Sequence, residues 1–417
     1  MSSLVLRDAA SLVPFAAVPV RGPDLTSIDV LANASVTFEE DRVAQVGPTV
    51  SGQGGFDASG CTVVPGFVDC HTHLPFFGWR ADEDAARLGG ARYETLHGED
   101  GGIFRSARML GEASDAEVLE FGESLANSML ERGTTTFEMK SGYGLSIAAE
   151  IRQLQLARTL ASGVKQTTTT TCLAAHAIPK EKSAGEWIGE VASDLLPRIA
   201  EEGLAEACDI YVESIAFALE HAARLAEAAR PLGLRMRMHG DQLEDGQAAS
   251  FAARWGFATA DHLNHTSPDA IHDIGAGDTV AVLLPGATFT LRQQRKPSAR
   301  NLIDANAIVA LGTDLNPGTS PILSMTFVIA LACRIYGLRP LEALAASTVN
   351  AAFALGLEDE VGRLVPGLRG DAVVVEGPSF EHVPYRADHD PVAAVVCGGE
   401  LVYVAPGHEW RTRSLSS

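Results

Sequence analysis

Short runs of apolar or β-branched residues alternate along the chain with longer stretches in which apolar residues recur every three or four positions. Continuous apolar runs separated by helical patterns are typical of a parallel sheet that helices cover on both sides. Eight such runs occur: VVPGFVD (63–69), TTTFEMK (134–140), TTTTTCLAAH (167–176), ACDIYV (207–212), RMRMHG (235–240), TADHL (259–263), TVAVLLP (279–285) and AIVALGTD (307–314). Eight strand–helix units in a segment of this length predict an α/β fold, a closed (β/α)8 barrel of the TIM type.

Two of the intervening stretches carry clear helical signals. Residues 146–160 place apolar side chains on one helical face. Residues 183–199 begin with Ser183 and have Glu186 three positions later, the pairing that caps a helix N-terminus. Both stretches are therefore predicted to be helices that cover the barrel.

The two ends of the chain have strand signals and no strong helical pattern. These signals are LVLRDA (4–9), VTFEEDRVAQVG (36–47), DAVVVEG (371–377) and VAAVVCGGELVYV (392–404). Terminal β segments on either side of a barrel pair most simply with each other. We therefore expect residues 1–62 and 362–417 to form one small β-sandwich-like domain, and residues 63–361 to form the barrel.

Composition and charge narrow the class of protein. The chain has 417 residues, 46% of them hydrophobic and 20% charged, enough for one large domain and a smaller one. The 32 basic and 53 acidic residues give a net charge of -21, which disfavours binding to nucleic acid or to anionic membranes. No run of 18 uninterrupted apolar residues occurs, and Asp8 interrupts the apolar N-terminus, so neither a membrane span nor a signal peptide is predicted.

The cysteines suggest a reducing compartment. All six are scattered through apolar segments and form no CxxC motif, as expected of reduced thiols in a cytoplasmic protein. A homodimer is expected only because dimers are common among soluble enzymes of this size.

Histidines gather where the predicted strands end. In a (β/α)8 barrel the C-terminal strand ends converge on one mouth. The residues found there are His71 and His73 after the first run, His176 after the third, His239 in the fifth, His262 in the sixth and Asp314 in the eighth.

The expected chemistry is that of a metal centre. His71, His73, His239 and Asp314 form a ligand set for one divalent transition metal ion, with a position left open for water. Zinc fits such a set best, and iron or manganese would also fit. The alternative is that a paired HxH merely ends a strand with polar residues and that His262 is a hydrogen-bonded core histidine.

Six motifs give the chain a family resemblance. DCHTH and the histidines and aspartate at the later strand ends are similar to those of the amidohydrolase superfamily. RLGGARYETLHGEDGGI (87–103), EMKSGYGL (138–145), AAHAIP (174–179), ADHL (260–263), LLPGATFTL (283–291) and TDLNPGTS (313–320) resemble the imidazolonepropionases. This resemblance implies hydrolysis of a cyclic amide, 4-imidazolone-5-propanoate, to N-formimino-L-glutamate in histidine degradation.

The resemblance also implies roles for individual residues. Asp314 would move a proton from water to the leaving nitrogen, with His262 polarising the carbonyl or shuttling the proton. Arg80 would bind the substrate carboxylate through paired hydrogen bonds, a role its chemistry also suits in so acidic a protein. The other residues implied to contact substrate are Tyr93, Tyr143, His176 and Asn316, although Asn316 could instead form an Asx turn before Pro317.

One departure from the family pattern affects the proton path. Many imidazolonepropionases have a glutamate three residues after the fifth-strand histidine, where this chain has Gln242. An amide can orient a substrate or water but cannot accept a proton, so Asp314 and His262 carry the transfer, or Asp241 or Glu244 contributes, or the substrate differs. The fourth run offers no lysine that could bridge two ions, which predicts a single ion.

Two other functions stay open at this point. A deaminase or another hydrolase of the same superfamily would share the metal chemistry and act on a different heterocycle. A catalytically inactive barrel that serves as a binding or scaffold protein is the remaining alternative, and the complete ligand set disfavours it.

Overall fold

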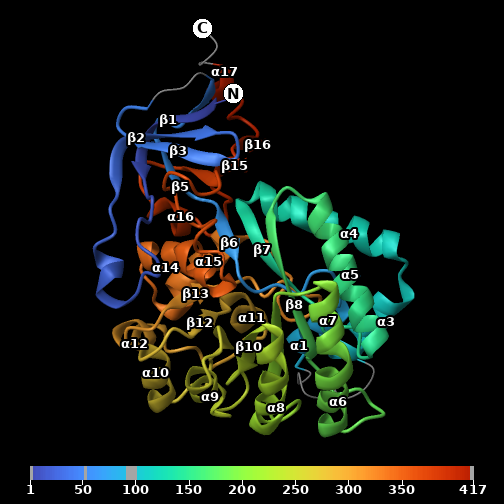
Figure 1. Cartoon of the computed structure of the whole chain (residues 1–417). Coiled ribbons are helices and arrows are strands. Elements are labelled where there is room, and N and C mark those ends of the chain that lie inside the picture. The colour runs from blue at the N-terminus through green and yellow to red at the C-terminus, as the bar shows by residue number, and fades with distance from the viewer. Residues whose placement is uncertain (1–2, 51–53, 91–100, 414–417) are drawn as a thin grey trace.

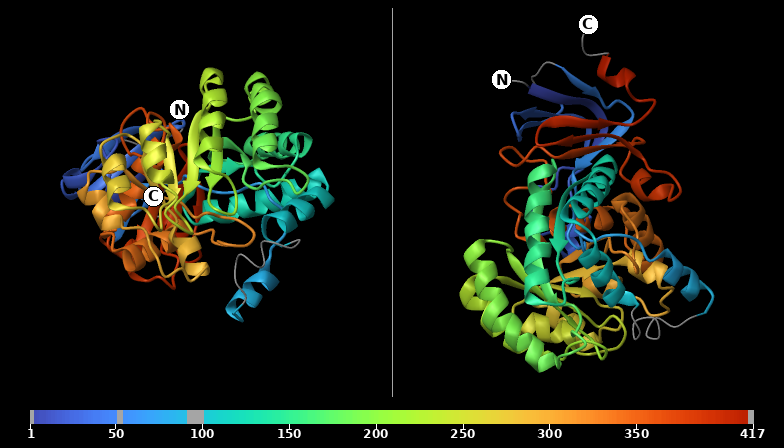
Figure 2. Two further views of the ribbon diagram at one scale, coloured as in Figure 1. Left: turned by 90° about the horizontal axis from the view of Figure 1, so that it is seen from below. Right: turned by 90° about the vertical axis from the view of Figure 1, so that its right-hand side faces the viewer.

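The computed structural model describes residues 3–50, 54–90 and 101–413, which form a barrel and a separate sheet (Figure 1). The sheet lies at one end of the barrel, and both the first and the last strands of the chain belong to it (Figure 2).

The barrel contains the eight strands expected from the apolar runs. Each strand pairs in parallel with the next one along the chain. The strands are β6 (Phe67–Asp69), β7 (Thr134–Lys140), β8 (Thr167–Ala175), β9 (Ala207–Val212), β10 (Arg235–Gly240), β11 (Thr259–His262), β12 (Val280–Leu283) and β13 (Val309–Leu311). A parallel bridge between Thr72 and Leu315, just beyond β6 and β13, brings the two edge strands together. The predicted (β/α)8 fold is confirmed.

Helices follow the barrel strands and cover their outer face (Figures 1 and 2). The α-helices of this part are α1 (Ala81–Leu88), α3 (Gly102–Glu112), α4 (Asp115–Glu131), α5 (Ile147–Gly163), α6 (Ala184–Glu190), α7 (Leu196–Glu202), α8 (Leu219–Ala229), α9 (Ala248–Arg254), α10 (Pro268–Gly275), α11 (Pro285–Thr290), α12 (Ala299–Asp304), α13 (Met325–Leu331), α14 (Pro340–Ala346) and α15 (Val349–Leu355). Short 3-10 turns lie at Gly22–Thr26 and Arg230–Leu232, and single π turns at Val191–Leu195 and Ala332–Tyr336.

The two helices expected from the sequence form with small differences. Ser146 caps α5, and the reciprocal bonds between Ser183 and Glu186 cap α6 as predicted. The segment 183–199 is not one regular helix, however, because a π turn separates α6 from α7. Pro197 follows this turn, and a proline in a helix interior removes a backbone hydrogen bond.

The terminal strands form one continuous hydrogen-bonded sheet. Its order is β16–β15–β14–β5–β1–β2–β3, with β4 paired to β1. The strands are β1 (Ser3–Leu12), β2 (Leu31–Glu39), β3 (Arg42–Gly47), β4 (Gly55–Asp57), β5 (Cys61–Pro65), β14 (Ala372–Glu376), β15 (Val392–Cys397) and β16 (Glu400–Val404). Helices α16 (His382–Tyr385) and α17 (Trp410–Arg413) accompany it. A core cluster shared by strands from both chain ends holds this sheet together.

The first apolar run divides between the two sheets. Residues 63–65, expected in the first barrel strand, pair with β14 in the terminal sheet, and the barrel strand begins at Phe67. Gly66 separates the two strands, and a side chain there would collide with Thr135, since an added Cβ would lie 2.0 Å from Oγ1. In the described part of the chain, no helix combines the length and apolar character needed to cross a bilayer.

Candidate metal centre and active site

Backbone pairing at the closing edge of the barrel brings the first histidines next to Asp314. The Asp314 N–H donates to the His71 carbonyl at 3.0 Å, and the His73 N–H donates to the Leu315 carbonyl at 2.9 Å. These bonds place residues that are distant in sequence at the same level of the barrel mouth. His239 arrives there at the end of β10.

Three imidazoles and one carboxylate converge at this level. His71, His73 and His239 offer ring nitrogens that all lie within 4.8 Å of one another. Asp314 Oδ1 lies 3.2 Å from His73 Nε2 and 3.6 Å from His71 Nε2. Ligands about 2.1 Å from one tetrahedral ion lie about 3.4 Å apart, so these separations fit donors that share an ion.

The hydrogen bonds of two histidines also fit metal binding. His71 Nδ1 lies 2.6 Å from Asp261 Oδ2, and His239 Nδ1 lies 3.1 Å from Asp209 Oδ1. A carboxylate that accepts from Nδ1–H selects the tautomer whose Nε2 lone pair can bind a metal. Nε2 of His71 and Nε2 of His239 are both buried, and neither has a hydrogen-bond partner among the described residues. Buried nitrogens in this state are the donors that a divalent ion would satisfy.

The protonation states follow from burial and charge. Burial, together with the nearby Lys140 ammonium, holds the pKa of His71 well below its usual value. Burial also lowers the pKa of His73, although Asp314 opposes this effect. Burial by itself raises the pKa of Asp314. The His73 hydrogen bond and the surrounding histidines lower it by more, so the net pKa is below its ordinary value. Neutral imidazoles and an ionised carboxylate are the forms that bind metals.

His262 lies beside the ligand set on β11. Its ring centroid is 5.4 Å from that of His239, and burial lowers its pKa to about 3, so the ring is neutral near pH 7. Both His262 and Asp314 have left-handed backbone conformations, with φ of 79° and 55°. Non-glycine residues rarely adopt such angles, and those that do cluster at functional sites.

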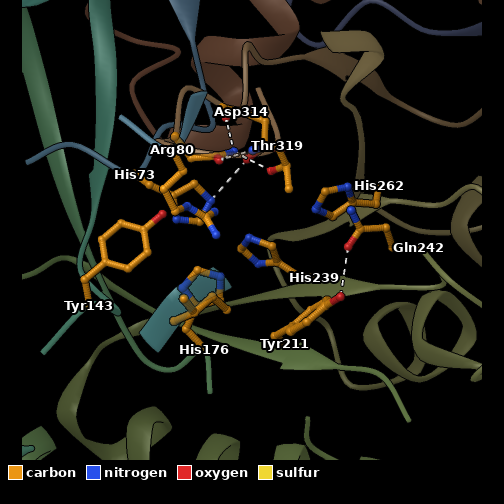
Figure 3. Close-up of a pocket in the computed structure, with 12 residues that line it drawn as sticks. His73, Arg80, Tyr143, His176, Tyr211, His239, Gln242, His262, Asp314 and Thr319 are labelled. Carbon is orange, nitrogen blue, oxygen red and sulfur yellow. Dashed lines mark hydrogen bonds and ion pairs between the residues drawn. The ribbon is translucent and has the colours of Figure 1, made fainter. Parts of the chain in front are cut away.

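A narrow cavity opens beside these residues (Figure 3). The space among them is about 410 Å³ when the open mouth is included. The residues that line it are His73, Arg80, Ile103, Tyr143, His176, Tyr211, His239, Gln242, His262, Asp314, Asn316 and Thr319. The cavity therefore includes most of the residues expected to bind substrate or catalyse its reaction.

Arg80 brings a buried positive charge to the cavity. The residue precedes α1 and is only 4% exposed, and its Nη1 donates to Glu83 Oε2 at 2.9 Å. The guanidinium lies against the backbone of Gly318, where an added Cβ would stand 1.9 Å from Nη2. Only glycine permits so close an approach, so the loop after β13 is shaped around this arginine.

Aromatic side chains form the wall next to His73. The His176 ring stacks on that of His73, with centroids 5.0 Å apart and planes 16° apart. The Tyr143 ring lies 5.6 Å from His176, and both line the cavity as expected. Tyr93, the other tyrosine expected to contact substrate, lies outside the described residues.

Gln242 lines the cavity and has fixed partners. Its Oε1 accepts a hydrogen bond from the Tyr211 hydroxyl at 3.0 Å, and its backbone N–H donates to Glu213 Oε1 at 2.5 Å. Glu213 also accepts from the Leu243 N–H, and burial raises its pKa to about 7. Neither Tyr211 nor Glu213 was expected at the site, because the strand pattern gave no sign that the end of β9 faces this loop.

The other candidate proton acceptors have different surroundings. Asp241 accepts hydrogen bonds from the backbone N–H groups of Gly246, Ala248 and Ala249, at 3.0 to 3.2 Å, and so anchors the start of α9. Glu244 is exposed and lies outside the residues that line the cavity. Of the acceptors considered from the sequence, Asp314 and His262 are the ones that line it.

Asn316 lines the cavity but its polar atoms are bound within its own loop. Its Nδ2 donates to the Asp314 carbonyl and to Thr319 Oγ1, at 2.6 and 2.7 Å. Its Oδ1 accepts from the N–H groups of Gly318 and Thr319. These contacts form the Asx turn considered as the alternative to a direct substrate contact.

Comparisons with known proteins agree with this geometry. A family model described as the amidohydrolase family matches residues 62–402. Two proteins named imidazolonepropionase are each 40% identical: that of Symbiobacterium thermophilum, covering 96% of this chain and 97% of its own length, and that of Rubrobacter xylanophilus, covering 96% and 99%. The chain belongs to the imidazolonepropionases, within the amidohydrolase family.

Solved structures of the same fold are more distant in sequence. A variant of atrazine chlorohydrolase from Arthrobacter aurescens, complexed with zinc and atraton, has a TM-score of 0.75 at 16% identity, covering 96% of this chain and 95% of its own. An adenosine deaminase from Xanthomonas campestris with bound zinc has a TM-score of 0.72 at 18% identity, covering 97% and 93%. At these identities the likeness shows the fold alone.

Proposed function

We propose that this imidazolonepropionase family member hydrolyses 4-imidazolone-5-propanoate to N-formimino-L-glutamate and uses one divalent metal ion, zinc in the first instance. The observation that carries the proposal is the arrangement of one cavity, where His73, His239 and Asp314 and the buried guanidinium of Arg80 share the lining. A hydrolytic centre next to a fixed positive charge suits a cyclic amide that bears a carboxylate.

The four donors define what the ion would do. His71, His73, His239 and Asp314 would hold a divalent ion, which would supply activation of water near neutral pH and polarisation of the substrate carbonyl. The chain contributes the rest of the chemistry. His71 and His239 hold their Nε2 atoms toward the site because Asp261 and Asp209 bind their Nδ1 atoms.

Asp314 and His262 manage the proton in this proposal. The water oxygen adds to the carbonyl carbon of the ring, the carbon–nitrogen bond breaks, and the nitrogen receives a proton. Asp314 is ionised, so its free carboxylate oxygen takes the proton from water and delivers it to the nitrogen. Neutral His262 donates a hydrogen bond to the oxygen on which negative charge develops. Gln242 orients the substrate ring without taking up a proton.

Arg80 binds the propionate group in this proposal. Glu83 holds one edge of the guanidinium, while Nε has no hydrogen-bond partner among the described residues. An anionic substrate supplies what this buried donor lacks. Tyr143 and His176 contact the ring from the aromatic wall next to His73, and we assign Tyr93 the same role from the family resemblance. Asn316 acts by shaping the loop that carries Asp314 and Gly318.

An assay with a panel of substrates tests the proposal. Purified protein loaded with zinc should consume imidazolonepropionate and form formiminoglutamate in equal amounts, and release no ammonia from purines or pterins. Ammonia release without formiminoglutamate would assign a deaminase function instead. No turnover of either kind by protein that contains the metal would favour a binding or scaffold role.

Metal identity, assembly and location belong to the same proposal. We propose zinc over iron or manganese, a homodimer, and a cytoplasmic location, for which the support is that all six cysteines are free thiols. Elemental analysis of protein purified from cells grown without added metal, and sedimentation equilibrium, test the first two.

A further inference from the structure

Beneath the metal donors, a second group of charged side chains fills the interior of the barrel. Five of them come from four strands, and each is at most 3% exposed: Glu138, Lys140, Asp209, Arg237 and Asp261. Charged groups are buried this deeply only when they are paired. The ion pairs among these five side chains therefore show which carboxylate needs which cation to stay charged.

Lys140 stands among the three carboxylates. Its Nζ lies 2.7 Å from Asp209 Oδ2, 3.0 Å from Glu138 Oε2 and 4.0 Å from Asp261 Oδ2. Asp209 and Asp261 have metal-ligand spacing together with His239. The cation found between them, however, is the ammonium group of Lys140.

A chain of contacts connects this ammonium to the metal position. Lys140 Nζ donates to Asp209, and the carboxylate of Asp209 lies 3.1 Å from His239 Nδ1. The other ring nitrogen of His239, Nε2, is one of the two buried metal donors that have no hydrogen-bond partner in the described part of the chain.

We infer that Lys140 is a positioning residue of the metal centre, which acts through Asp209 to keep His239 Nε2 turned toward the ion. The inference rests on the metal centre of the proposed function. Without the ammonium, the Asp209 carboxylate would lose the cation that holds it in place in a dry interior and would turn away from His239. That movement releases Nδ1 of His239 and with it the orientation of the ring.

Of the carboxylates that contact Lys140, Asp209 depends on it more than Glu138 does. Glu138 has other partners, since Arg237 Nη1 lies 3.1 Å from its Oε1 and Thr171 donates to the same atom at 2.5 Å. For Asp209, Lys140 is the only lysine or arginine within ion-pair distance among the described residues. Removal of Lys140 should therefore act on Asp209 first.

A cycle of variants tests the inference. Lys140→Met, Asp209→Asn and the double variant are stripped with a chelator, and their zinc affinity is measured by competition with a chromophoric chelator. Each single variant should bind zinc roughly 10–100-fold more weakly than the wild type. The double variant should bind no more weakly than the weaker single variant, because both changes break the same chain of contacts.

Arg300→Met is the matched control. Arg300 donates to the buried carboxylate of Glu342 at 3.1 and 2.5 Å and does not line the cavity. Its loss should lower the melting temperature and leave zinc affinity unchanged. Melting of each metal-free variant reports on folding separately, and Asp209→Asn alone suffices if Lys140→Met does not fold.

Two results would overturn the inference. One is zinc affinity within twofold of the wild type in Lys140→Met, or in Asp209→Asn if only that variant folds. The other is a double variant whose zinc affinity is weakened by the product of the two single-variant factors, since Lys140 would then act independently of Asp209. A wild-type protein that takes up no zinc, iron or manganese would refute the proposed function itself, so the two failures are distinguishable.

Discussion

At the scale of single residues, Asp314 has the most direct role because it is both a proposed metal donor and the proposed proton carrier. Asp314→Asn keeps the size of the side chain and removes the proton acceptor. We expect kcat to fall at least ~100-fold, the lower range for loss of a general base, with the circular dichroism spectrum unchanged. Metal content measured in the same sample separates loss of the proton path from loss of the ion. A kcat within twofold of wild type would remove Asp314 from the mechanism.

Arg80 is predicted to act on binding. Arg80→Met should lower kcat/KM for imidazolonepropionate at least ~30-fold, mainly through KM, because a buried charged hydrogen bond contributes about 2–5 kcal/mol. Steady-state kinetics give both constants. Arg152→Met is the control, since Arg152 makes three hydrogen bonds away from the cavity. An equal KM effect in the control would show that the Arg80 result reflects general destabilisation.

Glu213 predicts a pH dependence of stability. The pKa of its carboxyl is about 7 in the fold against an ordinary value of 4.5, so the folded state binds the proton more tightly than the unfolded chain does. The resulting stabilisation is fully present below about pH 4 and is lost as the pH rises through 7, up to about 3 kcal/mol. Glu213→Gln should reduce the decline in urea-unfolding free energy between pH 5 and 8. Glu120→Gln, an exposed residue of α4 whose charge is not among those that act on Glu213, should leave it unchanged.

At the scale of elements, the loop after β13 positions both Asp314 and Arg80. Gly318→Ala places a Cβ where the Arg80 guanidinium lies, so its kinetic effect should match that of Arg80→Met in direction. Gly277→Ala is the matched control, because Gly277 is also a loop glycine and no atom lies within 4 Å of the added Cβ there. Normal KM in Gly318→Ala would mean that the arginine can bind substrate from another position.

Elements were also the scale at which the sequence was most informative. All eight barrel strands were predicted, because buried parallel strands are continuous apolar runs that end in polar residues. The layer formed by Asp209, Lys140 and Asp261 was missed, since a charged residue inside an apolar run does not reveal its partners on other strands. One signal in the sequence could have indicated this charged layer. Arg237 and His239 lie two positions apart in one strand, so both side chains point into the barrel interior.

At the scale of the whole molecule, the chain ends build a sheet that the sequence predicted, but its junction with the barrel was misplaced by a few residues. Both strands around Gly66 are buried and apolar, so the pattern contained no boundary. The hydrogen bonds that Asn316 and Asp241 make within their own loops were not predicted from the sequence, because they depend on loop geometry. The cavity residues Tyr211 and Thr319 were not predicted at all.

Metal removal should affect the whole molecule as well as its activity. An ion bound at a concentration 1,000 times its Kd adds about 4 kcal/mol to the stability of the folded state. Chelator-treated protein should therefore melt at a lower temperature, and zinc should restore the original melting temperature. Differential scanning calorimetry measures this shift, and an identical transition in both samples would contradict a buried, occupied metal site.

The most direct test of the metal-dependent mechanism is a titration of chelator-stripped protein with zinc while formiminoglutamate formation from imidazolonepropionate is followed. The account predicts no turnover without metal, a linear rise on addition of zinc, and saturation at one ion per chain. Full turnover by stripped protein whose metal content is below detection would contradict it.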